Sequence, residues 1–449
     1  MLSDFCLFIR HARILLPSGE FLLGDIHTCG RRIVQVAPDI PVPTDVTAYK
    51  EIDAQGLTLL PGVIDPQVHF REPGLEHKED LFTASCACAK GGVTSFLEMP
   101  NTRPPTTTQA PLDDKLKRAA DKCLVNYGFF IGATPANQPD LHNAQPTCGI
   151  KIFMGSAHGA LLVDHEAVIE PIFAQGFSEG KYNRLIAVHA EDQARINQRR
   201  KEFAGITDPA VHSKIQDNQA ALNATKLALK LSKKYQRRLH ILHLSTAEEA
   251  ELLREDKPSW VTAEVTPQHL LLNTDAYAEI GTLAQMNPPL RSCHDNEVLW
   301  QALLDGVIDF IATDHAPHTL EEKAKGYPHT PSGMPGVETS LPLMLTQAIE
   351  GRCSVAQVSD WMSTAVALAY GIPNKGAIAP GYDADLVLVD LENYHPVLRE
   401  ELLTKCGWSP FEGWNLTGWP VMTIVGGQVV YDRGKLNTDV RGEALTFTS

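Results

Sequence analysis

Short apolar runs recur along the chain between residues 58 and 320, and stretches with helical spacing separate them. Runs that are apolar nearly throughout are typical of strands covered on both faces, and strands that alternate with helices favour a parallel sheet with right-handed crossovers. Eight such units predict an α/β fold of the (β/α)8 TIM-barrel type. The expected strands are LLPGVIDPQVHF (59–70), VTSFLEMPN (93–101), VNYGFFIGA (125–133), GIKIFMGS (149–156), RLIAVHAED (184–192), RLHILHLS (238–245), WVTAEVTP (260–267) and DFIATDHAPH (309–318).

One of the intervening stretches, residues 218–235, carries the clearest helical pattern. Apolar residues recur there near helical spacing, as at Leu222 and Leu229. Asn218 can cap the start of this helix, and Lys234 suits its carboxyl end.

Both ends of the chain show the alternating pattern of β-strands, interrupted by Gly and Pro turns. The runs are FCLFIRHARILLPSGEFLLGDI and RRIVQVAPDI at the front, and GYDADLVLVDL and VMTIVGGQVVYDRGKL at the back. Neither end has enough strands to form a stable sheet of its own, so we expect both to pair into one small β-sandwich lobe beside the barrel. The expected organisation is the first part of the lobe at 1–57, the barrel at 58–375 and the second part of the lobe at 376–449.

The composition is that of an acidic globular protein, with 43% hydrophobic residues, 21% charged residues and a net charge of −15. This charge argues against broad nucleic-acid binding, which needs clustered Lys and Arg. Nine cysteines without a C-x-x-C pair fit reduced thiols better than a disulfide framework. The start MLSDFCLFIRHARILL is broken by Asp4, Arg10 and His11, so we expect neither a signal peptide nor a membrane span. We therefore expect a cytoplasmic protein.

Polar residues fall at the carboxyl ends of the expected strands, which is where TIM barrels carry their catalytic groups. A random scatter would not place them there. In chain order they are His69, Asn101, His189, His243, Asp314 and His318, with Lys151 on the fourth strand.

Lys151 lies among apolar residues in GIKIFMGS, where an unpaired ammonium is costly to bury. It could face a carboxylate or extend to the rim. Alternatively, desolvation lowers the pKa of a lysine, and its neutral amine can then capture carbon dioxide as a carbamate, an anionic bridging ligand.

Taken singly, His69, His189 and His243 each fit a structural role among the 17 histidines of the chain. Together, imidazoles from three parallel strands converge on one barrel mouth, and with a carboxylate they form a nitrogen and oxygen set suited to zinc or another borderline divalent metal. Asp314 could bind that metal and shuttle a proton, or it could cap a helix. His240, three residues before His243, is expected on the opposite strand face.

The ordered set DPQVHFREPGLEHKEDL, GGVTSFLEMPNT, IKIFMGS, VHAED, HILHLST, EVTPQHLLL, MNPPLR and ATDHAPHT resembles the dihydroorotases, within the cyclic amidohydrolases of the amidohydrolase superfamily. The similarity spans most of the chain, and REPG with TDHAPH makes it specific. The resemblance implies a barrel with a β-sandwich lobe and the reversible, zinc-dependent cyclisation of N-carbamoyl-L-aspartate to L-dihydroorotate in de novo pyrimidine biosynthesis.

The resemblance also assigns roles to individual residues. The chain would hold one or two zinc ions, with carboxylated Lys151 as the bridging ligand. His189 and His243 would bind one metal, and His69 and Asp314 the other. Asp314 would be the catalytic proton shuttle. The residues that would bind the substrate are Arg71, Asn101 and His318 at its carboxylate, and Asn287 with the backbone at Pro335 and Gly336 at its ring. Without the motif, Arg71 beside Glu72 would equally suit an ion pair on the rim.

The chain departs from the family at Gln67, where dihydroorotases usually have the first histidine of H-x-H. A glutamine carbonyl oxygen is a weaker zinc ligand than imidazole. We therefore expect one tightly held metal on Lys151, His189 and His243, with the site near His69 and Asp314 partly filled or empty.

Two other functions fit the same residues. The chain could be a catalytically silent relative that supports aspartate transcarbamoylase, or a cyclic amidohydrolase that opens another ring, as in hydantoinases, dihydropyrimidinases or allantoinases. Arg71 and Asn101 argue against other rings, because those substrates lack the exocyclic carboxylate. The resemblance leaves a homodimer and an association with aspartate transcarbamoylase open.

Overall fold

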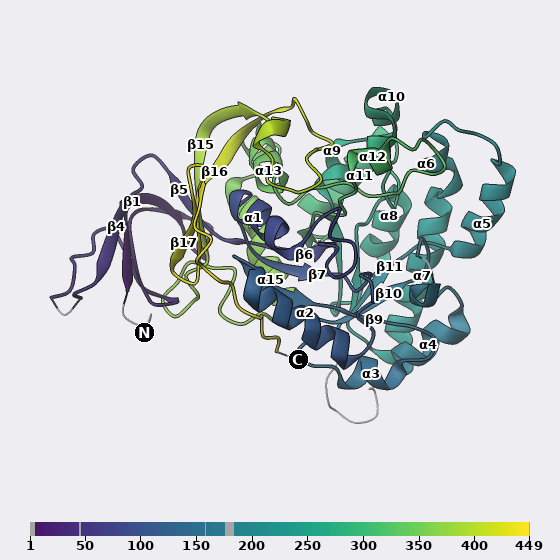
Figure 1. Cartoon of the computed structure of the whole chain (residues 1–449), viewed down its shortest axis with the longest axis horizontal. Helices are drawn as coiled ribbons and strands as arrows, with labels where there is room; N and C mark the ends of the chain where they lie inside the picture. Colours follow the sequence, from purple (N-terminus) through teal and green to yellow (C-terminus); the bar gives the residue numbers. More distant parts are fainter. Residues whose placement is uncertain (1–4, 45, 158, 176–183, 449) are drawn as a thin grey trace.

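Eight strand positions run parallel around a barrel, which lies beside a strand-rich lobe in the computed structural model of the chain (Figure 1). The structure describes residues 5–44, 46–157, 159–175 and 184–448. Strands β6–β7–β8 form one hydrogen-bonded run and β9 to β14 form another, and a parallel bridge between Val68 and His315 joins β6 to the end of β14. The barrel strands are β6 (Val63–Val68), β7 (Val93–Glu98), β8 (Asn126–Phe129) with β9 (Ile131–Gly132), β10 (Ile150–Phe153), β11 (Ile186–His189), β12 (Leu239–Ile241), β13 (Val261–Val265) and β14 (Phe310–Ile311).

All eight expected strands form, and the first expected run divides into two strands. Its start is β5 (Thr58–Pro61), which pairs in the lobe, and its continuation is β6 in the barrel. The division falls at Gly62, whose backbone passes so close to Thr94 that any side chain would overlap it. The Gly62 N–H donates to the carbonyl of Asp385, 2.9 Å away.

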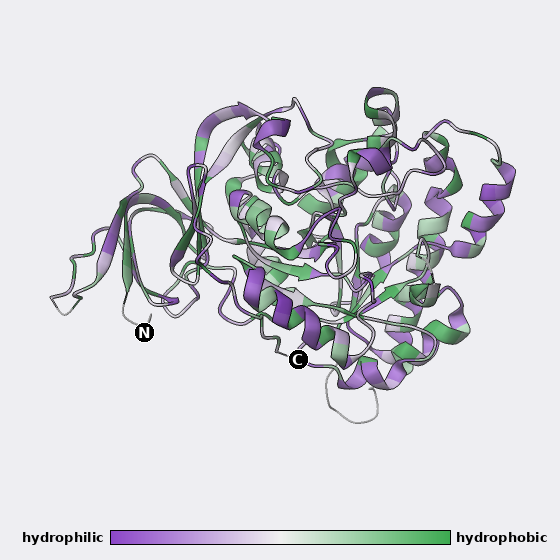
Figure 2. Cartoon of the chain, in the orientation of Figure 1, coloured by the Kyte–Doolittle hydropathy of each residue, from purple (hydrophilic) through white to green (hydrophobic). Residues whose placement is uncertain are grey.

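Helices cover the outside of the barrel. Figure 2 shows hydrophobic residues along the barrel strands and hydrophilic residues on outer helices such as α5. The helices are α1 (Leu81–Lys90), α2 (Gln109–Lys122), α3 (Gln138–Asn143), α4 (Glu166–Ala174), α5 (Gln193–Glu202), α6 (Val211–Ile215), α7 (Asn218–Tyr235), α8 (Ala247–Asp256), α9 (Pro267–Leu271), α10 (Ala276–Ile280), α11 (Cys293–Leu304), α12 (Leu320–Lys323), α13 (Ser340–Ile349), α14 (Val355–Ser359) and α15 (Ala365–Tyr370). None of these helices, among the residues described, is long and apolar enough to cross a membrane.

Helix α7 has the expected bounds, but the expectation that Asn218 caps it is wrong. The cap is Asp217, whose backbone is extended and whose carboxylate accepts the N–H of Ala220 at 3.1 Å. Asn218 is the first helical residue, and its amide donates instead to Glu248 and Asp295. The extended backbone that a capping side chain needs lies one residue earlier than the composition indicated.

Strands from both ends of the chain share one nine-stranded sheet in the lobe. Strand β5 pairs parallel with β1 and antiparallel with β15, so the two ends meet there. The sheet also extends into a C-terminal hairpin and encloses an apolar core of its own. The remaining lobe strands are β1 (Cys6–Leu15), β2 (Phe21–Cys29), β3 (Arg32–Ala37), β4 (Tyr49–Asp53), β15 (Leu386–Pro396), β16 (Asn415–Val425), β17 (Gln428–Asp432) and β18 (Lys435–Leu436).

Two stretches of the C-terminal segment pack against the barrel and not within the lobe sheet. The tail returns to the barrel, where the Leu445 N–H donates to the carbonyl of Tyr127 at 2.8 Å. The connection between β15 and β16 reaches the barrel mouth, where the indole N–H of Trp408 donates to the carbonyl of His318 at 2.7 Å. The C-terminal segment therefore contributes to the surroundings of the mouth.

A buried ion pair supports the loop that follows β6. Lys115 Nζ lies 2.8 Å from Glu98 Oε2, and both side chains are fully buried. The other oxygen of Glu98 accepts the N–H of Phe70 at 3.1 Å. The pair thus fixes the backbone next to His69.

Replacing Lys115 with Met should lower the free energy of unfolding by about 3–5 kcal/mol, because it leaves the carboxylate of Glu98 buried without its partner. Equilibrium unfolding in urea measures this loss. Lys117→Met, on the exposed face of the same helix, is the matched control and should change stability by less than about 0.5 kcal/mol. Equal effects of the two substitutions would show that the buried pair does not stabilise the fold.

Candidate active site

The ends of β6, β7 and β14 bring His69, Asn101 and Asp314, respectively, into contact. His69 Nδ1 lies 2.7 Å from Asn101 Oδ1, and His69 Nε2 lies 3.1 Å from Asp314 Oδ1. Burial lowers the pKa of His69, so its ring is neutral, and its single proton satisfies the amide oxygen of Asn101. The lone pair on Nε2 then faces a carboxylate oxygen. A cation between them would satisfy both atoms.

Gln67 lies beside the same carboxylate. Its amide Nε2 donates to Asp314 Oδ1 at 3.1 Å, and its Oε1 is buried without a hydrogen-bond partner among the residues described. The side chain at this position therefore contacts Asp314 as a hydrogen-bond donor.

A second contact joins the ends of β11 and β12. His189 Nδ1 lies 2.9 Å from His243 Nε2, and His189 Nε2 lies 2.7 Å from Glu191 Oε2. The carboxylate of Glu191 holds the proton on Nε2, which leaves the Nδ1 lone pair directed at His243. Burial, together with the neighbouring His189 and Lys151, holds the pKa of His243 well below its usual value.

Three residues at the mouth have left-handed backbones, with φ of 69° at Arg71, 36° at His243 and 46° at Asp314. This conformation costs a residue other than glycine about 1–2 kcal/mol. Such strain is concentrated at functional sites, where the surrounding structure holds it in place.

Lys151 lies on β10 and is only 1% exposed. Its Nζ is without a hydrogen-bond partner among the residues described and lies 4.6 Å from the ring centre of Phe153. Burial lowers the pKa of Lys151 to about 7, opposed by the carboxylates of Asp314 and Glu264. The amine is therefore neutral for a substantial fraction of the time near pH 7, as formation of a carbamate requires.

These residues fit a divalent metal with a carboxylated lysine. No three His, Cys, Asp or Glu side chains form a ready metal group in the described part of the chain. At the mouth, however, a ring nitrogen of His189 faces one of His243, and a ring nitrogen of His69 faces the carboxylate of Asp314. The amine of Lys151 has no hydrogen-bond partner among the described residues. Modification of Lys151 would add the anionic oxygens that this set lacks.

Arg71 and His318 meet at the edge of this group. Arg71 Nε donates to the carbonyl of Pro317 at 3.1 Å, and its NH2 lies 3.3 Å from His318 Nε2. Burial, followed by the charge of Arg71, lowers the pKa of His318 to about 3. His318 is therefore neutral, and the positive charge belongs to Arg71. Asn101 was expected to bind the substrate carboxylate together with Arg71 and His318, and its side chain here contacts His69.

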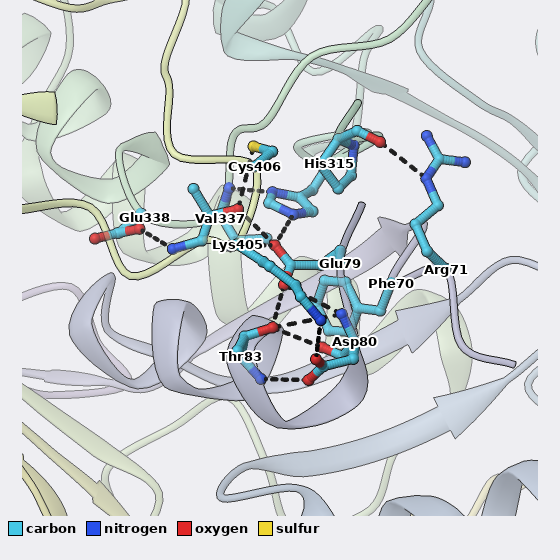
Figure 3. Close-up of polar contacts among 12 residues, drawn as sticks. Phe70, Arg71, Glu79, Asp80, Thr83, His315, Val337, Glu338, Lys405 and Cys406 are labelled. Carbon is cyan, nitrogen blue, oxygen red and sulfur yellow. Dashed lines mark hydrogen bonds and ion pairs between the residues drawn. The ribbon is translucent and has the colours of Figure 1, made fainter. Parts of the chain in front are cut away.

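Pro335 and Gly336 lie in a buried loop that His315 holds. The Nδ1 of His315 accepts the N–H groups of Gly336 at 3.1 Å and Val337 at 3.4 Å, while its Nε2 faces Glu79 at 3.7 Å (Figure 3). His315 follows Asp314 directly, yet its ring points toward this loop. It therefore fixes the backbone that was expected to contact a substrate ring.

The expectation that His240 faces away from the site is wrong. Its Nε2 lies 2.9 Å from one carboxylate oxygen of Glu264, and the other oxygen accepts the N–H of His243 at 3.4 Å. Strand β12 ends at Ile241, so strict alternation no longer holds at His243. Glu264 itself was missed, although a carboxylate within the apolar run VTAEV is the same signal that singled out Lys151.

Glu191 was also missed as a contributor to the site. The motif VHAED places it two residues after His189, on the same side of an extended chain. That spacing was the available signal. The expected ring contact, Asn287, is linked to Glu191 through the amide of Gln216.

Comparison with known proteins agrees with this geometry. The amidohydrolase family matches residues 58–430. The chain is similar to a dihydroorotase of Methanosarcina acetivorans, with 35% identity over 97% of this chain and 92% of the relative, and to one of Anoxybacillus flavithermus, with 34% identity over 95% and 98%. Among solved structures it resembles an L-hydantoinase (dihydropyrimidinase) from Arthrobacter aurescens, with a TM-score of 0.91, 31% identity and 98% and 99% of the two chains covered. The chain belongs to the amidohydrolase family, among the cyclic amide hydrolases that include the dihydroorotases.

Proposed function

We propose that the chain is a dihydroorotase, which interconverts L-dihydroorotate and N-carbamoyl-L-aspartate in de novo pyrimidine biosynthesis. The observation that carries the proposal is the buried guanidinium of Arg71 at the mouth. The Nε of Arg71 already donates to the carbonyl of Pro317, so its two terminal nitrogens are the ones that can form a bidentate contact with a carboxylate. Hydantoin and dihydrouracil have no exocyclic carboxylate for this contact. The relatives named dihydroorotase support the same substrate.

The proposal includes zinc held by His189, His243 and a carboxylated Lys151, with His69 and Asp314 at the second position. The facing lone pairs and the lowered pKa of Lys151 support this assignment. When bound, zinc would lower the pKa of water toward about 7 and polarise the ring carbonyl.

Asp314 is the proposed proton shuttle. The amide of Gln67 donates to its Oδ1, which orients the carboxylate and leaves Oδ2 to accept a proton from the attacking water. As the ring C–N bond breaks, Asp314 passes that proton to the leaving nitrogen. Arg71 and His318 hold the substrate carboxylate, with Asn101 beside them. Cyclisation runs the same steps in reverse.

The first test is the rate of L-dihydroorotate hydrolysis by the purified chain with added zinc. We expect turnover that a chelator abolishes and that exceeds turnover of hydantoin and dihydrouracil, because only dihydroorotate uses Arg71. Faster turnover of hydantoin would place the chain with the hydantoinases. No turnover by folded, zinc-loaded protein would favour the silent relative.

Replacing Arg71 with Lys should raise the KM for L-dihydroorotate by about 10- to 100-fold, because the point charge of lysine cannot form the forked contact. The change in kcat should be smaller. Arg254→Lys, on the surface of α8, is a matched control and should leave both constants unchanged. An unaltered KM in the Arg71 variant would mean that the substrate carboxylate binds elsewhere.

The proposal assigns one tightly held zinc to the chain, because Gln67 stands where the family usually has a histidine. Gln67→His should therefore raise zinc content from about one to about two per chain, since imidazole is the stronger ligand. Elemental analysis after dialysis measures this, with Gln67→Asn as the control that keeps an amide. Equal zinc in all three proteins would refute the assignment.

The same proposal leaves a homodimer and an association with aspartate transcarbamoylase open, as the resemblance does, and it includes a cytoplasmic location. The free thiols of the nine cysteines support that location. Sedimentation of the purified chain with and without aspartate transcarbamoylase would decide the first two.

A further inference from the structure

A polar network connects the candidate metal ligand His189 with the candidate ring contact Asn287. Glu191 holds His189 at one end. With the Gln216 amide oriented so that both of its polar atoms find partners, its nitrogen lies 3.0 and 3.1 Å from the two carboxylate oxygens of Glu191 and 3.1 Å from Asn287 Oδ1. His212 closes the network, with Nε2 2.8 Å from the same Oδ1.

The chemistry of these partners fixes the orientation of Gln216. A carboxylate only accepts hydrogen bonds, so the Gln216 atom that faces Glu191 is the amide nitrogen. The same nitrogen faces the side chain of Asn287, so the Asn287 atom nearest to it must accept. That atom is the oxygen.

His212 leads independently to the same orientation of Asn287. Its Nε2 lies 3.1 Å from the carbonyl oxygen of Met286, which can only accept, so Nε2 carries a proton. Burial lowers the pKa of His212 to about 4, so the ring is neutral and this is its only N–H. It is directed at the oxygen of Asn287 as well.

We propose that His212 and Gln216 are positioning residues that turn the Asn287 oxygen inward, so that its Nδ2 offers hydrogens to a carbonyl oxygen of the substrate ring. Asn287 is only partly buried, and its contacts with His212 and Gln216 are made through Oδ1, so Nδ2 is the atom that can turn to a ligand. A ring that presented an N–H at this point would meet a second donor and be rejected. The inference rests on the proposed function for the identity of the ring, but the orientation of Asn287 stands apart from it.

The network also connects the proposed ring contact with the residues proposed to bind the substrate carboxylate. Ser332 Oγ lies 3.5 Å from His212 Nε2, and the carbonyl of Ser332 lies 3.0 Å from His318 Nε2. His212 and His318 therefore contact the same residue from two sides. A ligand held by Arg71 and His318 would have Asn287 within the same mouth.

Neutron diffraction from a deuterium-exchanged crystal tests the orientation without any substrate. We expect two deuterons on the Asn287 atom that faces away from His212, and deuterons on the Gln216 atom that faces Glu191. Deuterons on the Asn287 atom next to His212 would overturn the proposal, even if the enzyme hydrolyses L-dihydroorotate.

Calorimetric binding of L-dihydroorotate tests the polarity of the contact. Asn287→Asp keeps the inward oxygen but presents an oxygen to the ligand, so it should bind at least about tenfold more weakly than Asn287→Ala. Tighter binding by the Asp variant would show that Asn287 accepts from the ring, and would overturn the proposal. Failure of the unmodified chain to bind or turn over L-dihydroorotate would instead refute the proposed function, and neutron diffraction would still decide the orientation.

His212 has its own pair of variants. His212→Phe removes the donor but keeps a ring against Tyr327, and should raise the KM about tenfold with zinc content unchanged. His212→Gln restores an N–H and should recover part of the loss. Equal constants for the two variants would mean that His212 only fills space.

Discussion

The cost of burying charge inside a closed barrel is the constraint on which the rest of this structure depends. Lys151, Glu264 and Asp314 are each almost fully buried at or below the mouth. An isolated charge there would be strongly destabilising, so each group must lose its charge or find a partner. Burial lowers the pKa of Lys151 and raises that of Glu264 for this reason. The same desolvation lowers the pKa of His69 and of His243.

Buried carboxylates also connect segments that are distant in sequence. Glu79 accepts the N–H of Lys405 at 3.0 Å (Figure 3), and Glu338 accepts the N–H of Leu403 at 2.9 Å. Through these bonds the segment between β15 and β16 is attached to the loops that carry Arg71 and Gly336. A carboxylate without such donors would be too costly to bury, so each contact orders two loops together. The C-terminal segment therefore belongs to the support of the mouth as well as to the lobe.

Gln67 shows how one side chain changes the organisation of the site. A histidine at this position would share a cation with His69 and Asp314, and the cation would set their spacing. The amide instead donates directly to Asp314. Orientation of the proposed proton shuttle thus comes from a hydrogen bond within the chain, which does not depend on a second metal.

The sequence by itself determined the barrel, the lobe and the residues at the strand ends, because hydrophobic runs and period-two alternation are local properties of the chain. Composition placed the helix cap at Asn218, one residue away from the true cap. Alternation placed His240 on the wrong face, because strand β12 ends before His243 and the alternation ends with it. Only the tertiary structure joined Glu191, Gln216, Asn287 and His212. His212 and Gln216 lie four residues apart at helix α6, but Glu191 and Asn287 come from separate loops. No spacing along the chain records which hydrogen bonds form when folding brings those loops to one mouth.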